Sequence, residues 1–260
     1  MSNGKLIGNA GRGLVTVASF LAVFLAWQFT VEGFGIRPVI LPTPAAIANE
    51  LASSPLWYLQ QGWYTLLTTL GGFFLAVVVG VALSVLIVEV RFLESTLYAF
   101  ILVLNTVPKV AIAPLFVIWL GTGSQPKIAI AFLIAFFAIV IDTVLGLKSV
   151  PPEMLDLAST LRGSRWGVLR RIRFPCALPS MFAGMKVAMS LSLVGAIVGE
   201  FVASERGLGY VILAAQGTFD TTRVFAAITV LALGGIVLFW FLSLVERRLL
   251  PWHTSQQPRH

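Results

Sequence analysis

Long apolar runs separated by short polar segments are the main pattern of this chain. Six runs have the length and apolarity of membrane-spanning helices: 14–30, 65–88, 95–120, 127–147, 183–202 and 225–244. About 20 such residues cross the hydrocarbon core of a bilayer. The first run follows Lys5 and Arg12, as in a signal peptide, but no small-x-small cleavage site follows it, so we expect a retained helix. The pattern predicts an all-α integral membrane protein with six transmembrane helices.

Composition supports a membrane protein. Of the 260 residues, 58% are hydrophobic and 11% are charged, and the mean hydropathy is +0.92. A soluble domain carries roughly 25% charged residues, so a soluble enzyme is nearly excluded. The single cysteine, Cys176, excludes an internal disulfide framework and a multi-cysteine metal cluster.

The basic residues lie mainly on one side of the predicted membrane. The formal net charge is +7. If the N-terminus is cytoplasmic, four cations lie outside (Arg37, Lys127, Arg206 and Arg223), Lys109 lies within a span, and the other 13 of the 18 lie inside. This asymmetry follows the positive-inside rule and places both termini in the cytoplasm. Topology therefore explains the charge, and nucleic-acid binding is not needed.

We expect one transmembrane domain over residues 1–260. It comprises a cytoplasmic N-terminus (1–13), a six-helix core (14–244) and a cytoplasmic tail (245–260). Before the second run, Thr43 and Pro44 are typical of an N-cap and first helical position. Trp57, Tyr58, Trp63 and Tyr64 then form an aromatic cluster that we expect to anchor at the lipid headgroups.

The cytoplasmic connection 149–181 is too long and too charged for an ordinary loop, and such loops often carry function. Its residue pattern predicts a short amphipathic helix opened by Pro151 and Pro152, a turn at Gly163 and Ser164, and a basic helix that Pro175 ends. The apolar face of the first helix comprises Met154, Leu157, Ala158 and Leu161. An alternative is an interfacial element that lies on anionic lipid.

The order of residues in this connection resembles the EAA loop of binding-protein-dependent ABC importer permeases. That pattern is Glu-Ala-Ala, three residues, Gly, nine residues, Ile-x-Leu-Pro. Here the positions are Asp156-Leu157-Ala158, then Arg162, then Ile172-x-Phe174-Pro175. Arg162 stands where the family has glycine. If the turn needs a positive φ, either Gly163 supplies it after a one-residue shift or the turn differs.

The resemblance extends from about residue 40 onward. It includes Leu41-Pro42-Thr43-Pro44, the segments 108–111 and 114–121, and Gly207-Leu208-Gly209-Tyr210. The chain is most similar to the nitrate, sulfonate and taurine-type permeases, whose relatives include transporters of thiamine pyrimidine precursors and of riboflavin. The resemblance implies the type I importer permease fold in a bacterial inner (plasma) membrane. It also implies a second permease copy, in a homodimer, and a periplasmic or extracellular substrate-binding protein.

In that family the loop forms a coupling helix that docks into a cleft on one of two ABC ATPase subunits. The resemblance carries this role to Glu153, Asp156, Leu157, Ala158, Leu161, Arg162, Gly163, Arg165, Ile172 and Pro175. An apolar face would fill the cleft, within a polar rim. The chain contains no GxxxxGK[ST] phosphate-binding loop. We therefore expect a transport subunit that is not an enzyme and binds no cofactor, with ATP and Mg²⁺ on the partner ATPase.

Polar and helix-breaking residues inside the runs indicate the translocation path, because ionisable groups facing lipid are costly. The candidates are Pro108, Lys109, Pro114, Asp142 and Glu200. Lys109 is either a positive site for an anionic substrate or a structural lysine paired with carbonyls or with Asp142. For Asp142 we favour a structural pair. Glu200 either acts at the outer mouth of the translocation path or is simply solvated.

The expected function is a permease subunit for a small anionic solute of the sulfonate, taurine or nitrate kind. Import of a thiamine pyrimidine precursor or of a riboflavin-like compound is the alternative. An ion-coupled secondary transporter would need paired intramembrane carboxylates or an inverted repeat, and neither is evident. A membrane-embedded enzyme would need a cluster of His, Asp or Glu at one depth. The two histidines, His253 and His260, instead lie in the polar tail.

Overall fold

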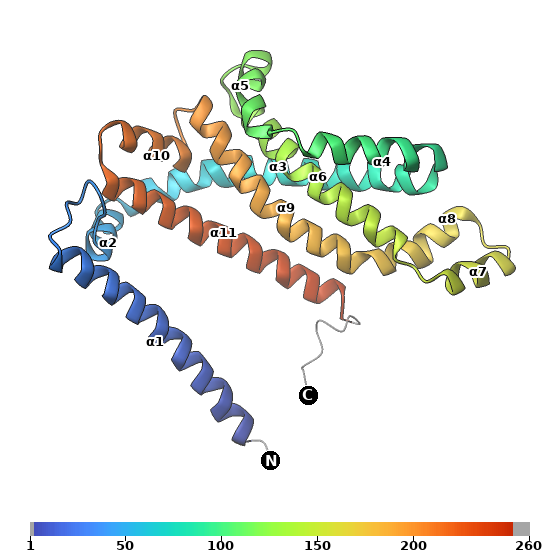
Figure 1. The fold of residues 1–260 in the computed structure, drawn as a ribbon, viewed down its shortest axis with the longest axis horizontal. Coiled ribbons are helices and arrows are strands. Elements are labelled where there is room, and N and C mark those ends of the chain that lie inside the picture. Colours follow the sequence, from blue (N-terminus) through green and yellow to red (C-terminus); the bar gives the residue numbers. More distant parts are fainter. Residues whose placement is uncertain (1–2, 252–260) are drawn as a thin grey trace. The chain divides into compact units, whose positions relative to one another are not determined.

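The computed structural model describes residues 3–251, with side chains described for all of these except 3–14, 91, 94 and 95 (Figure 1). Within this part of the chain every regular element is a helix. The chain divides into two compact units. One comprises Met1–Leu59 with Val211–Val230, and the other comprises Gln60–Tyr210 with Leu231–His260.

The first unit contains α1 (Asn3–Gly33), α2 (Pro44–Ser53), the start of α3 (Pro55–Glu89), most of α10 (Leu208–Gly217) and the start of α11 (Thr221–Leu249). Thr43 is the N-cap of α2 and its hydroxyl accepts a hydrogen bond from the Ala46 amide, as predicted. The Trp27 ring lies 5.9 Å from that of Phe225, so side-chain contacts join α1 to the start of α11.

The second unit is built on α6 (Ser124–Lys148) and α9 (Phe174–Val202), which pack along most of their lengths. Small residues permit the close approach. A Cβ on Gly195 would lie 2.6 Å from the Ala131 Cα, and a Cβ on Gly184 would lie 2.5 Å from the Asp142 Cβ. A core including Phe73, Ile139, Phe182 and Met189 fills the space around this pair. Helices pack this closely in membranes where their contacts are made by small side chains.

The predicted spans agree with the helices. Among the described residues, five helical stretches are long and apolar enough to cross a membrane: Val15–Gly33, Pro55–Glu89, Ser124–Lys148, Arg165–Val202 and Thr221–Leu249. Many of their large apolar side chains are exposed, as with Phe20, Ile236 and Trp240. In a helix bundle surrounded by lipid this exposure is expected, because lipid replaces the missing partners. The all-α membrane fold is confirmed.

The third predicted span, 95–120, is not one straight helix. It is divided between α4 (Arg91–Asn105) and α5 (Lys109–Leu120), which meet at an angle of 95°. Pro108 is the N-cap of α5, where it lacks an amide hydrogen and has extended backbone. The pair counts as the sixth span if it crosses as one broken element. Lys109 therefore begins a helix rather than lying in the middle of one.

Candidate functional site

The connection between the fourth and fifth spans has the predicted helix, turn and basic segment. α7 (Pro152–Thr160) begins at the two prolines, and α8 (Arg165–Val168) is capped by Ser164, whose hydroxyl accepts a hydrogen bond from the Gly167 amide. Leu169–Arg173 then form one π-helical turn that leads into α9. The three arginines Arg170, Arg171 and Arg173 lie in this turn.

The turn after α7 uses Arg162 itself, and not Gly163, for the left-handed conformation. Arg162 has φ +53. Its amide donates to the Ser159 carbonyl at 3.0 Å, and the Gly163 amide donates to the Ala158 carbonyl at 2.9 Å. These two bonds define a Schellman motif, in which the residue after the helix cap is left-handed and usually glycine. The suggested shift of this role to Gly163 is therefore wrong, because the motif fixes the position at 162.

Pro175 does not end the basic helix, contrary to the sequence prediction. Helical backbone continues from Arg165 to Val202. Within it, the amide of Phe174 donates to the Leu169 carbonyl, five residues back. A π turn next to the proline accommodates the missing amide and lets the chain stay helical.

An apolar hollow of about 590 Å³ lies between α7 and the segment around α8. Leu157 and Leu161 line it and are 61% and 74% exposed, and Trp166 on the facing segment is 68% exposed. Ala158 also lines the hollow but is buried. We call Met154, Leu157, Leu161 and Trp166 the α7–α8 apolar surface. Met154 and Leu157 are on one helix face, and Trp166 was not singled out from the sequence.

Lys109 binds its own helix boundary. Its Nζ donates to the backbone carbonyl of Asn105 at 2.7 Å and to the Asn105 side-chain oxygen at 2.9 Å. The same ammonium group lies 4.7 Å from the centre of the Phe137 ring. The first of these contacts satisfies a backbone carbonyl group left free at the end of α4. The contacts correspond to the structural interpretation of Lys109, with carbonyls in place of Asp142.

Asp142 packs between the two central helices. It is half-buried on α6 and lies against Gly184 of α9. No hydrogen bond or ion pair joins it to Lys109 in the part of the chain that the structure describes. Pro114 lies inside α5, on the same helix as Lys109. The structure thus places Lys109 and Pro114 together and does not bring Asp142 into contact with Lys109.

Glu200 lies near the end of α9 and is 1% exposed. Its Oε2 accepts hydrogen bonds from the Gly209 amide at 2.7 Å and from the Thr65 hydroxyl at 3.0 Å. Burial with specific donors excludes the simple solvation considered for this residue. Its two partners come from α3 and from the first turn of α10.

A polar cavity of about 750 Å³ lies beside Glu200, in the second unit, and we call it the Lys127 cavity. Lys127 of α6 donates to the Ser204 hydroxyl at 2.7 Å. Arg206 donates to the Tyr64 hydroxyl at 3.1 Å, and its guanidinium group lies 5.4 Å from the centre of that ring. The segment 203–206, between α9 and α10, thereby forms one wall of the cavity.

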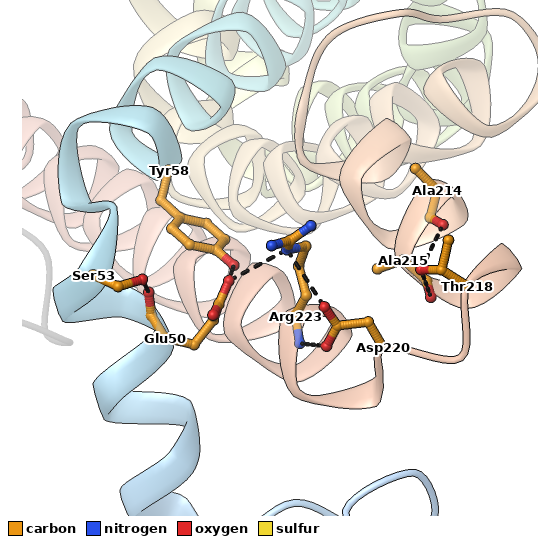
Figure 2. A network of polar contacts seen from close by, with 8 residues as sticks. All are labelled: Glu50, Ser53, Tyr58, Ala214, Ala215, Thr218, Asp220 and Arg223. Atoms are coloured by element: carbon orange, nitrogen blue, oxygen red, sulfur yellow. Dashed lines mark hydrogen bonds and ion pairs between the residues drawn. The ribbon is translucent and has the colours of Figure 1, made fainter.

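A separate polar network lies in the first unit (Figure 2). Glu50 of α2 accepts hydrogen bonds from the Tyr58 hydroxyl at 2.9 Å and from the Arg223 side chain at 3.3 Å. Asp220 caps the start of α11 through the Arg223 amide. Tyr58 is only 2% exposed, so the expectation of a headgroup anchor is wrong for it. Its hydroxyl is committed to Glu50 inside the protein.

The partners of Glu200 were not predicted, although the sequence contains a signal for them. Gln61, Thr65, Thr68 and Thr69 recur at helical spacing along one side of the otherwise apolar α3. Polar residues that share a face of a spanning helix normally face other protein groups. The contact itself joins positions 135 residues apart, which no local pattern specifies.

The sequence matches the family described as binding-protein-dependent transport system inner membrane component over residues 72–251. It is 38% identical to the riboflavin transport system permease protein RibX of Chloroflexus aurantiacus, covering 94% of this chain and 91% of that protein. The formylaminopyrimidine transport permease protein ThiX of Halalkalibacterium halodurans is 32% identical, covering 91% and 95%. The taurine transport system permease protein TauC of Escherichia coli is 30% identical, covering 91% and 89%.

The fold is also similar to that of a solved transporter. An inward-facing structure of the MetNI methionine ABC transporter matches with a TM-score of 0.63 at 18% identity, covering 76% of this chain and 97% of that one. At this identity the match supports the fold, which is that of a type I ABC importer permease. The family match and the relatives show that the chain belongs to the inner-membrane permeases of binding-protein-dependent ABC importers, in the sulfonate and taurine-type group.

Proposed function

We propose that this chain forms the translocation path of an ATP-driven importer and that the connection 149–181 couples it to two ATPase subunits. The observation that carries the coupling proposal is the α7–α8 apolar surface, whose leucines and tryptophan are exposed. Such side chains next to arginines suit a protein cleft with an apolar centre and a polar rim. Both termini would be cytoplasmic, as the charge asymmetry favours.

Coupling would work through differential binding. If the ATPase dimer holds α7 differently in its ATP-bound and free states, it shifts the permease between two conformations. α7 is joined through the Schellman turn to the continuous helix Arg165–Val202, which includes α8 and the π turn. A movement of α7 would thus be transmitted along this helix to the core of the second unit. ATP and Mg²⁺ would be bound by the partner, and this chain would supply the docking surface.

For the transported solute we propose a small organic compound, either an anion of the sulfonate or taurine kind or a riboflavin-like or pyrimidine compound. Relatives of both kinds are 30–38% identical over most of the chain. The ammonium group of Lys109 already contacts Asn105 and the Phe137 ring. An anion could bind there only if these contacts broke. Lys127 and Arg206, in contrast, line the Lys127 cavity.

The experiment is affinity purification of the tagged chain from its native membrane, followed by identification of the proteins present in stoichiometric amount. We expect two permease copies, two ATPase subunits and a substrate-binding protein. Riboflavin, a formylaminopyrimidine, taurine and an aliphatic sulfonate are then tested for ATP-dependent uptake into liposomes that contain the complex. Uptake by the permease alone, without ATP, would contradict the importer and favour the secondary transporter.

A further inference from the structure

The first turn of α10 is held by side chains from other helices. The amides of Gly207, Leu208 and Gly209 donate to Gln61 Oε1 at 2.7 Å, Thr65 Oγ1 at 2.9 Å and Glu200 Oε2 at 2.7 Å. The first amides of a helix have no partner within that helix. Here three consecutive amides each find a side-chain acceptor. We call Gln61, Thr65 and Glu200 the α10 cap.

Thr65 connects the parts of this cap. Its hydroxyl accepts from the Leu208 amide and donates to Glu200 Oε2 at 3.0 Å. Gln61, Thr65 and Glu200 are all buried, with Thr65 and Glu200 each 1% exposed. Side-chain acceptors that bind the free amides at a helix start stabilise that start, and leaving such a buried amide unpaired is costly.

Gly207 fits directly against the carboxylate. Its φ is +105, and a Cβ at this position would lie 2.3 Å from the Glu200 Cδ and Oε1. The second carboxylate oxygen, Oε1, is buried without a hydrogen-bond partner. Glu200 also lines the Lys127 cavity. Glu200 thus both holds the start of α10 through Oε2 and borders the cavity of which segment 203–206 forms one wall.

We propose that Glu200 is a positioning residue that, with Gln61 and Thr65, fixes the start of α10 and so holds segment 203–206 as a wall of the Lys127 cavity. Ser204 and Arg206 are then kept at their contacts with Lys127 and Tyr64. A consequence for import rests on the proposed function. The hydrogen bonding itself can be tested on the permease alone.

The test measures how fast a buried reporter on α10 is modified. Val211 lies in the first turn of α10 and is 2% exposed. Val211→Cys is introduced into the full chain carrying Cys176→Ser, and the protein is labelled in nanodiscs with a hydrophilic maleimide. We expect Glu200→Ala and Thr65→Val to raise the labelling rate about tenfold or more, because each leaves a buried amide unpaired.

Conservative variants separate positioning from folding and from charge. Glu200→Gln keeps an oxygen that can accept from Gly209 and Thr65, and Thr65→Ser keeps the hydroxyl, so both should label at the parent rate. Gly207→Ala should behave like Glu200→Ala, whereas Gly217→Ala, whose Cβ meets nothing within 4 Å, should not. Unchanged labelling in Glu200→Ala would overturn the proposal. Fast labelling in Glu200→Gln would also overturn it, since charge would then be the requirement.

This labelling needs neither the ATPase nor a solute. If no ATPase co-purifies with the chain, the proposed function fails while the labelling pattern can still hold. If the ATPase co-purifies and the conservative variants label like the alanine and valine variants, the α10 cap fails while the importer assignment remains. The two failures are therefore distinguishable.

Discussion

At the scale of single residues, Arg162 shows how a motif can persist after its usual residue is lost. A left-handed conformation costs a residue with a Cβ roughly 1–2 kcal/mol relative to its right-handed form. Arg162 adopts it nonetheless because both hydrogen bonds of the Schellman motif form. Arginine in place of the family's glycine at position 162 thus keeps the turn but makes it less stable.

We therefore predict that Arg162→Gly stabilises the turn after α7. Glycine removes the Cβ strain but adds conformational freedom to the unfolded chain, which leaves a net gain of about 0.5–1 kcal/mol. Amide hydrogen exchange at Gly163, whose amide bonds to the Ala158 carbonyl, should slow about two- to fivefold. Arg162→Ala is the control, since it removes the side chain but keeps the strain. Equal slowing in both variants would contradict the backbone explanation.

Residue patterns predicted local features better than distant contacts. Thr43 was predicted as an N-cap because a cap is specified within four residues, and the Ala46 amide indeed bonds to it. The prediction for Tyr58 is wrong because its hydrogen-bond partner Glu50 lies on another helix. The acceptors of the α10 cap were likewise missed, since Gln61 and Gly207 are 146 residues apart.

At the scale of elements, hydropathy located the spanning helices because lipid imposes one demand, a continuous apolar stretch with its backbone bonded internally. It did not predict the 95° angle between α4 and α5. Pro108 indicated a kink, but its size depends on how each helix packs, and a window average contains no such information. Hydropathy likewise did not predict that the helix continues through Pro175, because it contains no information about the π turn that precedes the proline.

Close helix contacts give a prediction at this scale. A Cβ on Gly72 of α3 would lie 2.4 Å from the Ala131 Cβ and 2.8 Å from the Phe132 amide nitrogen of α6. Gly72→Ala must push these helices apart, and overpacking of this kind costs typically 1–3 kcal/mol. We expect a lower midpoint of thermal unfolding in detergent.

Gly234→Ala is the matched control for this prediction. Gly234 lies in α11, and a Cβ there would meet nothing within 4 Å. Alanine in a helix interior is favoured over glycine by about 0.5–1 kcal/mol, so the midpoint should stay the same or rise. If the unfolding midpoint fell equally in both variants, the close contact between α3 and α6 at Gly72 would not be the cause of the fall.

At the scale of the whole molecule, the described helices leave two kinds of apolar surface. The exposed side chains of the spanning helices face the region where lipid is expected. The α7–α8 apolar surface differs, because its helix α7 is only nine residues long and its neighbours include three arginines. The proposed coupling role assigns this surface to a protein partner, so this is the surface on which an assembly test is best made.

Leu157→Glu should therefore abolish association with the ATPase while leaving membrane insertion intact. Leu157 is 61% exposed, so the permease loses little packing, whereas a carboxylate buried unpaired in an apolar cleft is strongly unfavourable. The measurement is the molar ratio of ATPase to permease after affinity purification. Ser159→Glu is the control, because two positions along a helix are 200° apart and the same charge then lies on the opposite side of α7. Retained ATPase in Leu157→Glu would refute the docking assignment, and loss in both variants would show that added charge anywhere on α7 prevents assembly.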